Sequence, residues 1–210
     1  MEIVLASASP RRRELLTMLG LKDFKVIPAV GEEAPTKGMT AFDAVCALSL
    51  AKAEEVSKLC PKDSLIIAAD TIVALDGDHL GKPADEEDAF LMLSRLSGRM
   101  HRVYTGVTVM RGERIITDYE RTCVSFRSMS EREIRAYIAT GEPMDKAGAY
   151  GAQGIGALFV EGIEGDFFNV MGLPLCRLSA MLEKLGYSLI CGMAAPLRRG
   201  FCAAAPGRST

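Results

Sequence analysis

The chain has 210 residues, with 25 Lys and Arg against 27 Asp and Glu, and 49% of its residues are apolar. This balance is typical of a globular protein with a sizeable core, and it excludes a wholly basic nucleic-acid binder and an acidic disordered chain. No apolar run approaches the roughly 18 residues of a membrane span. The six cysteines form no C-x-x-C pair. We therefore expect a cytoplasmic protein with reduced thiols and neither a membrane nor a nucleic-acid partner.

Short apolar strands alternate with helices, which predicts a mixed α/β protein. Helix starts are marked by the capping residues Ser9, Thr40, Asp85 and Ser130. In chain order we expect strands at 2–6, 24–29, 64–69, 72–75, 103–110 and 115–126, and then a hairpin of 158–163 with 166–171. We expect one folded domain over residues 1–188 and a poorly ordered tail over 189–210, which is rich in Ala, Gly, Pro and Arg.

A run of arginines occupies the first turn of the first predicted helix, after Ser9-Pro10. Cations there oppose the helix dipole by roughly 0.3–1 kcal/mol each. Arg11 and Arg12 make sense if an anion docks on them, and phosphate is the natural candidate because the preceding strand would deliver it to the helix start. Ser7 and Ser9 would add hydroxyl donors. A solvated basic helix start is the alternative.

Acidic residues follow two of the predicted strands. Asp70 stands at the predicted end of a buried strand, at the edge of the sheet, where a carboxylate can ligate Mg²⁺ or take a proton from water; many strands also end in Asp simply as a turn residue. Glu32 and Glu33 lie in a loop and could complete an oxygen-only metal site, although a solvated acidic loop is the alternative for this pair alone.

Lysines and one glycine-rich segment complete the candidates. Lys52, Lys82 and Lys146 could each neutralise phosphate charge, and each alone could equally be a surface charge. The segment 148–156 holds four glycines, which suits a loop facing a ligand. Within it, Gln153 can both donate and accept, as the edge of a pyrimidine requires. A tight turn with a solvated Gln is the alternative.

Taken together, these segments resemble the Maf family of nucleotide pyrophosphatases, which hydrolyse nucleoside triphosphates to the monophosphate and pyrophosphate. The match covers about residues 3–187 and leaves out only the tail. The motifs that carry the resemblance, in order, are Ser7-Ala-Ser-Pro-Arg-Arg, Glu32-Glu33, Ala69-Asp70-Thr71, Gly81-Lys82-Pro83, Leu96-Ser-Gly-Arg99 and Asp145-Lys-Ala-Gly-Ala-Tyr-Gly-Ala-Gln153-Gly.

The resemblance implies a Maf/ITPase-like α/β fold: a mixed, elongated central sheet with flanking helices, in two lobes around a cleft. It implies that Asp70 is the catalytic proton acceptor and that the enzyme needs a divalent metal cation, Mg²⁺ or Mn²⁺. We expect Asp70 and Glu33 to be the metal ligands, with Glu32 as the alternative to Glu33. Family members are often dimers, so a homodimer is a further expectation, although nothing in the sequence marks an interface.

Three positions bear on the substrate. Arg11, Thr71 and Gln153 match the subgroup that cleaves dTTP and UTP, so the resemblance implies that activity, with modified pyrimidine nucleotides in the same class. The alternatives are the same chemistry on 7-methyl-GTP or modified purine nucleotides, and a non-catalytic nucleotide-sensing regulator of cell division. The expected substrate-binding residues are Ser7, Ser9, Arg11, Arg12, Lys52, Thr71, Lys82 and Gln153.

Overall fold

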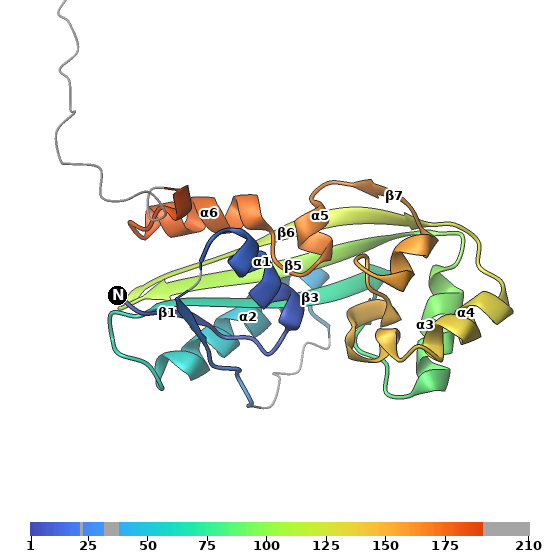
Figure 1. The fold of residues 1–210 in the computed structure, drawn as a ribbon, viewed down its shortest axis with the longest axis horizontal. Helices are drawn as coiled ribbons and strands as arrows, with labels where there is room; N and C mark the ends of the chain where they lie inside the picture. The colour runs from blue at the N-terminus through green and yellow to red at the C-terminus, as the bar shows by residue number, and fades with distance from the viewer. Residues whose placement is uncertain (22, 32–37, 191–210) are drawn as a thin grey trace, which may run out of the picture.

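The computed structural model describes residues 1–21, 23–31 and 38–190. It shows a seven-stranded mixed sheet with helices on both faces (Figure 1), which confirms the expected fold class. The strand order is β2-β1-β3-β5-β6-β7, and β4 pairs with β3. The strands are β1 (Ile3–Leu5), β2 (Phe24–Val26), β3 (Leu65–Leu75), β4 (Asp78–Leu80), β5 (Met100–Arg111), β6 (Arg114–Phe126) and β7 (Val160–Glu164).

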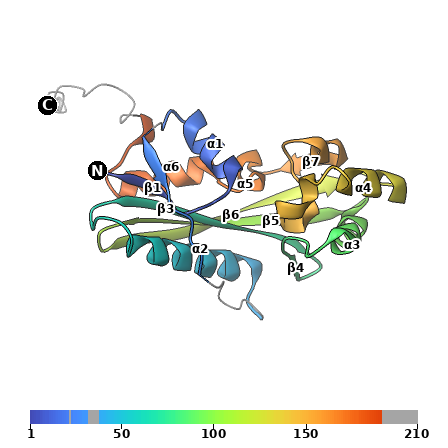
Figure 2. The same ribbon diagram turned by 60° about the horizontal axis from the view of Figure 1, so that its bottom comes forward.

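Helices cover the sheet unevenly. Figure 2 shows α2 along one face, with α1 and α6 on the other. The helices are α1 (Pro10–Met18), α2 (Ala41–Ser57), α3 (Glu86–Leu96), α4 (Glu131–Ile138), α5 (Phe167–Val170) and α6 (Leu175–Lys184), and the 3₁₀ turns are η1 (Glu142–Asp145), η2 (Ala147–Ala149) and η3 (Ile155–Phe159). Within these described residues, no helix combines the length and the apolar character needed to cross a membrane.

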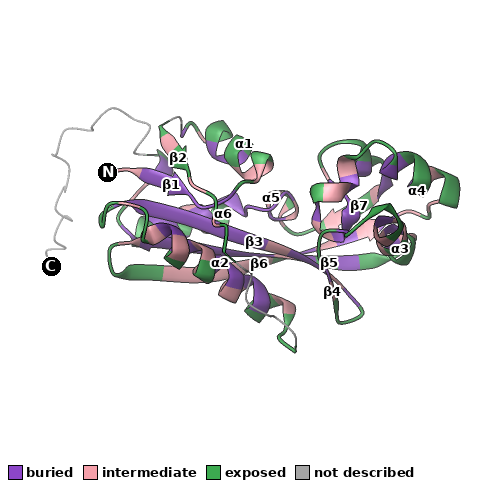
Figure 3. Cartoon of the chain, turned by 90° about the horizontal axis from the view of Figure 1, so that it is seen from below, coloured by how far each residue is buried: buried purple, intermediate pink, exposed green. Residues whose placement is uncertain are grey.

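The long strands β3, β5 and β6 join two lobes (Figure 3). The first lobe packs α1 and α6 on one face of the sheet and α2 on the other, and each face has its own buried apolar cluster. The second lobe packs α3, α4 and the 3₁₀ turns around the far ends of the strands, over a cluster that includes Leu93, Phe126 and Tyr137. Because three strands pass through both lobes, the lobes share a rigid spine.

Local capping signals predict the helix starts correctly. The Thr40 hydroxyl accepts a hydrogen bond from the backbone of Asp43 at 3.3 Å, and Ser130 forms a reciprocal capping box with Glu133. Ser9 stands at the N-cap of α1, although its side chain makes no capping bond. These starts depend on residues within one helical turn, which explains why the sequence reveals them.

Two expectations about the strands are wrong. β3 does not end before Asp70 but continues to Leu75, because β5 pairs with it along the whole length. The predicted strand 166–171 is the helix α5, since the Asp166 side chain caps it by accepting from the Phe168 backbone at 2.8 Å. Of the expected tail, residues 189 and 190 are described, and Leu189 is buried in the first lobe. The remaining tail, 191–210, lies outside the described residues.

One glycine sets the distance between α2 and the sheet. Gly106 on β5 lies directly opposite Asp70 on β3. A Cβ atom at Gly106 would stand 2.2 Å from the carbonyl oxygen of Val45 in α2, and backbone atoms cannot yield easily. The helix backbone therefore packs against the strand itself, which brings the side chains of α2 close to Asp70.

A neutral histidine is buried in the second lobe. His101 is 2% exposed, contacts the rings of Phe126 and Tyr150 edge-on, and shares a 2.8 Å hydrogen bond with the Tyr150 hydroxyl. Burial lowers its pKa to about 4 from an ordinary value near 6.5. The folded protein therefore takes up this proton only at a pH well below that at which the unfolded chain takes it up.

The Gly106→Ala substitution should destabilise the protein by about 1–3 kcal/mol, because the added methyl group forces α2 away from β5. The free energy of unfolding from urea denaturation measures this. Gly162→Ala is the matched control, because a Cβ at Gly162 meets no atom within 4 Å. An equal stability of both variants would contradict the close packing of α2.

The His101 pKa predicts acid sensitivity. Because the pKa is lowered in the folded state, the stabilisation from neutral His101 is complete above about pH 6.5 and is lost as the pH falls towards 4, by up to about 3 kcal/mol. Urea denaturation of the wild type and of His101→Gln from pH 7 to pH 4 should show a shallower decline in the variant. Parallel declines would show that His101 does not carry this dependence.

Candidate active site

The site forms where the sheet edge is left open. β1 pairs with β3 only as far as Leu5 opposite Ile67, with one more bond from the Ala6 backbone to the Ile67 carbonyl at 2.8 Å. β4 joins β3 again at Val73. Within the described chain, residues 68–72 of β3 therefore lack a strand neighbour on that side. Asp70 and Thr71 lie in this gap, and successive residues of a strand face opposite sides of the sheet.

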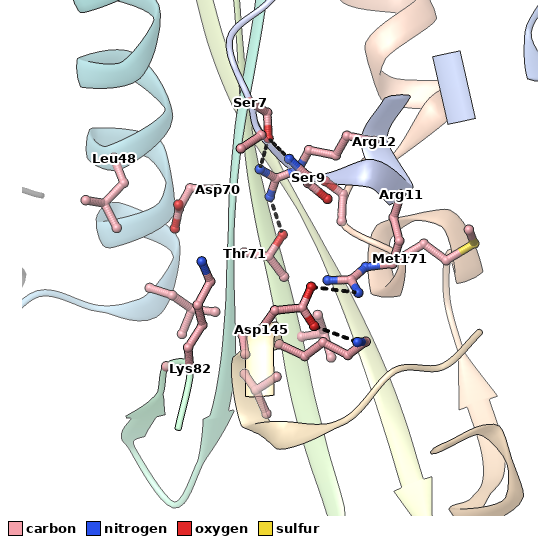
Figure 4. Close-up of a pocket in the computed structure, with 18 of the residues that line it drawn as sticks. Ser7, Ser9, Arg11, Arg12, Leu48, Asp70, Thr71, Lys82, Asp145 and Met171 are labelled. Carbon is pink, nitrogen blue, oxygen red and sulfur yellow. Dashed lines mark hydrogen bonds and ion pairs between the residues drawn. The ribbon is translucent and has the colours of Figure 1, made fainter. Parts of the chain in front are cut away.

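Arg12 fills the Thr71 side of the gap (Figure 4). Its guanidinium donates to the Gly172 carbonyl at 2.8 Å, to the Ser7 hydroxyl at 3.0 Å and to the Thr71 hydroxyl at 3.0 Å. The Ser7 hydroxyl also accepts from the backbone of Ser9 at 3.2 Å. A guanidinium has five N–H donors in a fixed plane. Two of these hydrogen bonds connect α1 to β3 and to the end of α5, and the third holds the segment between β1 and α1, so Arg12 joins these parts of the site.

The hydrogen of the Thr71 hydroxyl is used in a hydrogen bond within the protein. It lies 2.9 Å from the hydroxyl of Thr105, which donates to the Asn169 carbonyl at 3.0 Å. Because Thr105 has only one hydrogen to give, Thr71 must be the donor of the bond between the two hydroxyls. Thr71 can therefore offer a ligand an acceptor lone pair but no hydrogen.

Asp70 faces α2 on the other side of the sheet. Its carboxylate forms an ion pair with the ammonium of Lys52, and Asp70 is only 8% exposed. Lys52 reaches it because Gly106, opposite Asp70, allows α2 to lie close. The ammonium of Lys82 points into the same space from beyond β4 (Figure 4). One carboxylate thus stands among cationic side chains from two different elements.

A cavity of about 860 Å³ runs from this gap to the glycine-rich segment. That volume suits a small-molecule ligand, for which roughly 300–1,000 Å³ is typical. Among the described residues, the charged side chains that line it are five cations and three carboxylates, an excess of two positive charges in a chain of net charge −2. These charged residues are Arg11, Arg12, Lys52, Lys82, Lys146, Glu55, Asp70 and Asp145.

Asp145 connects the two lobes across the cavity. Its carboxylate lies 3.9 Å from the guanidinium of Arg11 on α1 and 2.6 Å from the ammonium of Lys146. Burial raises the pKa of Asp145. The hydrogen bond and the charge of Lys146, together with the charge of Arg11, lower the pKa by more than burial raises it, so the net shift is downward. Asp145 is therefore ionised at neutral pH and holds two cations at the cavity wall.

The loop that carries Gln153 is held from behind by Glu142. The Glu142 carboxylate accepts from the backbone N–H groups of Ile155 and Gly156 at 3.0 and 3.1 Å. Gln153 is exposed and lines the cavity. The glycines of this segment were expected to let a ligand approach. Three of them also pack closely against other side chains, since a Cβ at Gly151, Gly154 or Gly156 would lie within 3.2 Å of Glu142, Lys146 or Tyr137.

Glu32 and Glu33 lie outside the described residues. The residue before them, Gly31, lines the cavity, and its backbone N–H donates to the Glu55 carboxylate on α2 at 3.1 Å. The Val30 backbone donates to the same carboxylate at 2.8 Å. Glu55 therefore holds the backbone of residues 30 and 31, directly before Glu32 and Glu33 in the sequence.

The structure brings together every described residue that the sequence proposed. All of them line one cavity: Ser7, Ser9, Arg11, Arg12, Lys52, Asp70, Thr71, Lys82 and Gln153. The Leu96–Arg99 motif does not join them, because Arg99 binds the carboxylate of the Asp76 turn at 2.7 and 2.8 Å.

Sequence reasoning missed four side chains that shape the site, namely Glu55, Tyr137, Glu142 and Asp145. Each of them contacts a backbone group or a side chain that lies between 13 and 134 positions away in the sequence, which is farther than any local motif reaches. For Glu142, the recurrence of glycine at 151, 154 and 156 was the one signal in the sequence.

Comparisons with known proteins agree with this geometry. Residues 2–185 match the family described as Maf-like protein. A dTTP/UTP pyrophosphatase of Pelotomaculum thermopropionicum is 51% identical over 191 residues, covering 90% of this chain and 99% of the relative. One from Dictyoglomus turgidum is 50% identical, covering 90% and 98%. The structure of a HAM1 protein from Coxiella burnetii is more distant, with 15% identity and a TM-score of 0.49 over 88% of this chain and 99% of that one. The family match and the two relatives show that the chain belongs to the Maf family.

Proposed function

We propose that the protein hydrolyses dTTP and UTP to the nucleoside monophosphate and pyrophosphate. The observation that carries the proposal is the cavity itself, in which Asp70, at the gap in the sheet edge and paired with Lys52, shares one lining with four further cationic side chains. Two Maf relatives at about half identity are named for this activity, and they cover nearly the whole folded chain. A triphosphate is the ligand class that such an excess of positive charge favours.

The chain's own residues would perform the reaction as follows. Arg11, Arg12 and Lys82 bind the phosphate oxygens, with Lys52 beside them. Asp70 contacts Lys52 through one carboxylate oxygen, and through the other it orients a water and accepts its proton. The water oxygen bonds to the α-phosphorus while the bond from that phosphorus to the bridging oxygen breaks, and pyrophosphate leaves. Positioning and fixed positive charge supply most of the acceleration.

The donor set suits a divalent cation. Mg²⁺ is commonly held by one or two carboxylates together with substrate phosphates, so it needs no complete cage of protein ligands. The described residues contain no cluster of three or more His, Cys, Asp or Glu side chains that could hold a metal ion. However, Asp70 lines the cavity, and so does Gly31, the residue that precedes Glu32 and Glu33 in the sequence. Asp70 and Glu33 would hold the ion, Mg²⁺ or Mn²⁺. When bound, it would neutralise phosphate charge.

Base recognition would come from the second lobe. Gln153 would donate to and accept from the pyrimidine edge, while Thr71 could contribute only an acceptor. A nucleotide whose edge does not match an amide leaves buried polar groups unpaired, which can cost a large factor in selectivity. Together with Arg11, these residues support a preference for dTTP and UTP.

Asp70→Asn should lower pyrophosphate release from UTP by at least about 100-fold, because an amide cannot accept the proton from water. The thermal midpoint should stay close to that of the wild type, since Asn keeps the shape of the side chain. Asp78→Asn is the control, because Asp78 pairs with Arg95 on the surface. Near-normal turnover in Asp70→Asn would reject the base assignment. Binding of UTP by the wild type without any turnover would instead favour a nucleotide sensor.

Gln153→Ala should change selectivity more than catalysis. We expect the ratio of kcat/KM for UTP over CTP to fall by roughly ten- to a hundredfold, because the matching hydrogen bonds are lost. Leu158→Ala, an exposed position in η3 just after this segment, is the control. The assay uses UTP, dTTP, CTP and 7-methyl-GTP. An unchanged ranking would remove Gln153 from the specificity residues, and a wild-type preference for 7-methyl-GTP would overturn the proposed substrate.

A further inference from the structure

We propose that Glu142, supported by Tyr137, is a positioning residue that fixes Gln153 and thereby sets base selectivity. This inference rests on the proposed function. Glu142 lies in η1, behind the loop, and is not among the described residues that line the cavity. It can influence a bound base only through the residues that it holds. Gln153 lies between the backbone groups that Glu142 and Tyr137 hold, and it lines the cavity with a side chain that can pair with a base.

The clasp formed by Glu142 and Tyr137 grips the loop on both sides of Gln153. One carboxylate oxygen of Glu142 accepts from the Ile155 backbone at 3.0 Å, and the other accepts from the Gly156 backbone at 3.1 Å and from the Tyr137 hydroxyl at 2.9 Å. On the other side of Gln153, the Gly151 backbone donates to the Tyr137 hydroxyl at 3.1 Å. The loop is thus bound two residues before Gln153 and two residues after it.

The glycines of the loop are explained by this clasp. A Cβ at Gly154 would lie 2.8 Å from a Glu142 carboxylate oxygen, and a Cβ at Gly156 would lie 2.6 Å from the Tyr137 hydroxyl. At Gly151 it would lie 2.9 Å from the Lys146 side chain. The backbone therefore wraps closely around the Glu142 and Tyr137 side chains. If the glycines served only to let a ligand approach, an added Cβ at these positions would point towards the cavity and not into the Glu142 and Tyr137 side chains.

Holding the loop matters because an amide alone cannot distinguish uracil from cytosine. Uracil presents a carbonyl acceptor where cytosine presents an amino donor. A Gln side chain whose amide turns by half a turn exchanges its donor and acceptor, so it can match either base. Gln153 selects one base only if its backbone frame is fixed and one orientation of the amide is favoured. The clasp supplies that fixed frame.

The clasp is also coupled to the phosphate end of the cavity. The Lys146 ammonium donates to the Glu142 carbonyl and to the Asp145 carboxylate, and Asp145 contacts Arg11 on α1. Burial raises the pKa of Glu142, but the two backbone N–H donors and Tyr137 lower it more, so the carboxylate is ionised at neutral pH. A fixed, ionised acceptor suits a clasp that must not loosen when a ligand binds.

The test compares the dissociation constants of non-hydrolysable α,β-imido analogues of UTP and CTP by calorimetry. The variant is Glu142→Gln, which keeps the shape but offers one acceptor oxygen in place of two, so that one backbone N–H loses its partner. Glu131→Gln is the matched control, because Glu131 pairs with Arg135 on the exposed face of α4 in the same lobe. Tyr137→Phe is a second, milder variant that removes only the hydroxyl contacts.

We expect Glu142→Gln to reduce the preference for the UTP analogue over the CTP analogue by about tenfold, as for one lost charge-assisted hydrogen bond, with a smaller reduction in Tyr137→Phe. Amide hydrogen exchange at Ile155 and Gly156 should become faster. In a Gln153→Ala background, Glu142→Gln should cause no further loss of preference, because its effect passes through Gln153. A purely structural role would instead weaken both analogues equally.

An unchanged preference in Glu142→Gln, or an equal additional loss in the Gln153→Ala background, would overturn the inference. A wild type that binds both analogues equally would overturn it as well. Because these measurements record binding, they are separate from the test of the proposed function. A wild type that prefers the UTP analogue but releases no pyrophosphate would refute the hydrolysis and leave the positioning role of Glu142 standing.

Discussion

The site depends on the interruption of strand pairing along one edge of β3. β1 leaves the sheet after Leu5 because the chain must turn at Ser9-Pro10 to begin α1. The open edge that remains exposes both faces of β3 to one cavity, so that Asp70 meets Lys52 of α2 while Thr71 meets Arg12 of α1. Two side chains that are adjacent in sequence thus serve opposite faces of the sheet. No continuous sheet could bring these two groups to the same ligand.

The close approach of α2 makes this arrangement effective. A helix normally packs on a sheet through side chains on both sides, at about 10 Å between layers. Opposite Asp70, Gly106 removes the side chain from the sheet, and the backbone of Val45 occupies the space. Lys52 then reaches the carboxylate from the next turns of the same helix. Gly106 brings no side chain of its own to the site, yet it determines how Asp70 is paired.

The sequence predicts local features of this protein well and long-range ones poorly. Ser130 and Glu133 identify a helix start because both partners lie within one turn. The end of β3 was misplaced, since a strand ends where its neighbours end, and its partner there, Arg102 opposite Ala74, lies 28 residues along the chain. The site residues were predictable because their motifs are contiguous. Glu142 was not, because it recognises backbone groups, and a backbone N–H carries no signature in the sequence.

The division of labour between the lobes follows from their chemistry. In the proposed reaction, the first lobe would supply Asp70, Lys52 and Arg12 to act on phosphate, which needs charge in fixed positions. The second lobe would supply Gln153 to pair with a base, which needs a fixed hydrogen-bond frame. The proposed frame requires an ionised Glu142, and the core of the same lobe contains the neutral His101. Falling pH opposes both, since it protonates the acceptor of the clasp and charges the buried ring. Acid therefore acts on the second lobe at two points, and the proposed selectivity would be tied to the stability of the lobe that carries Gln153.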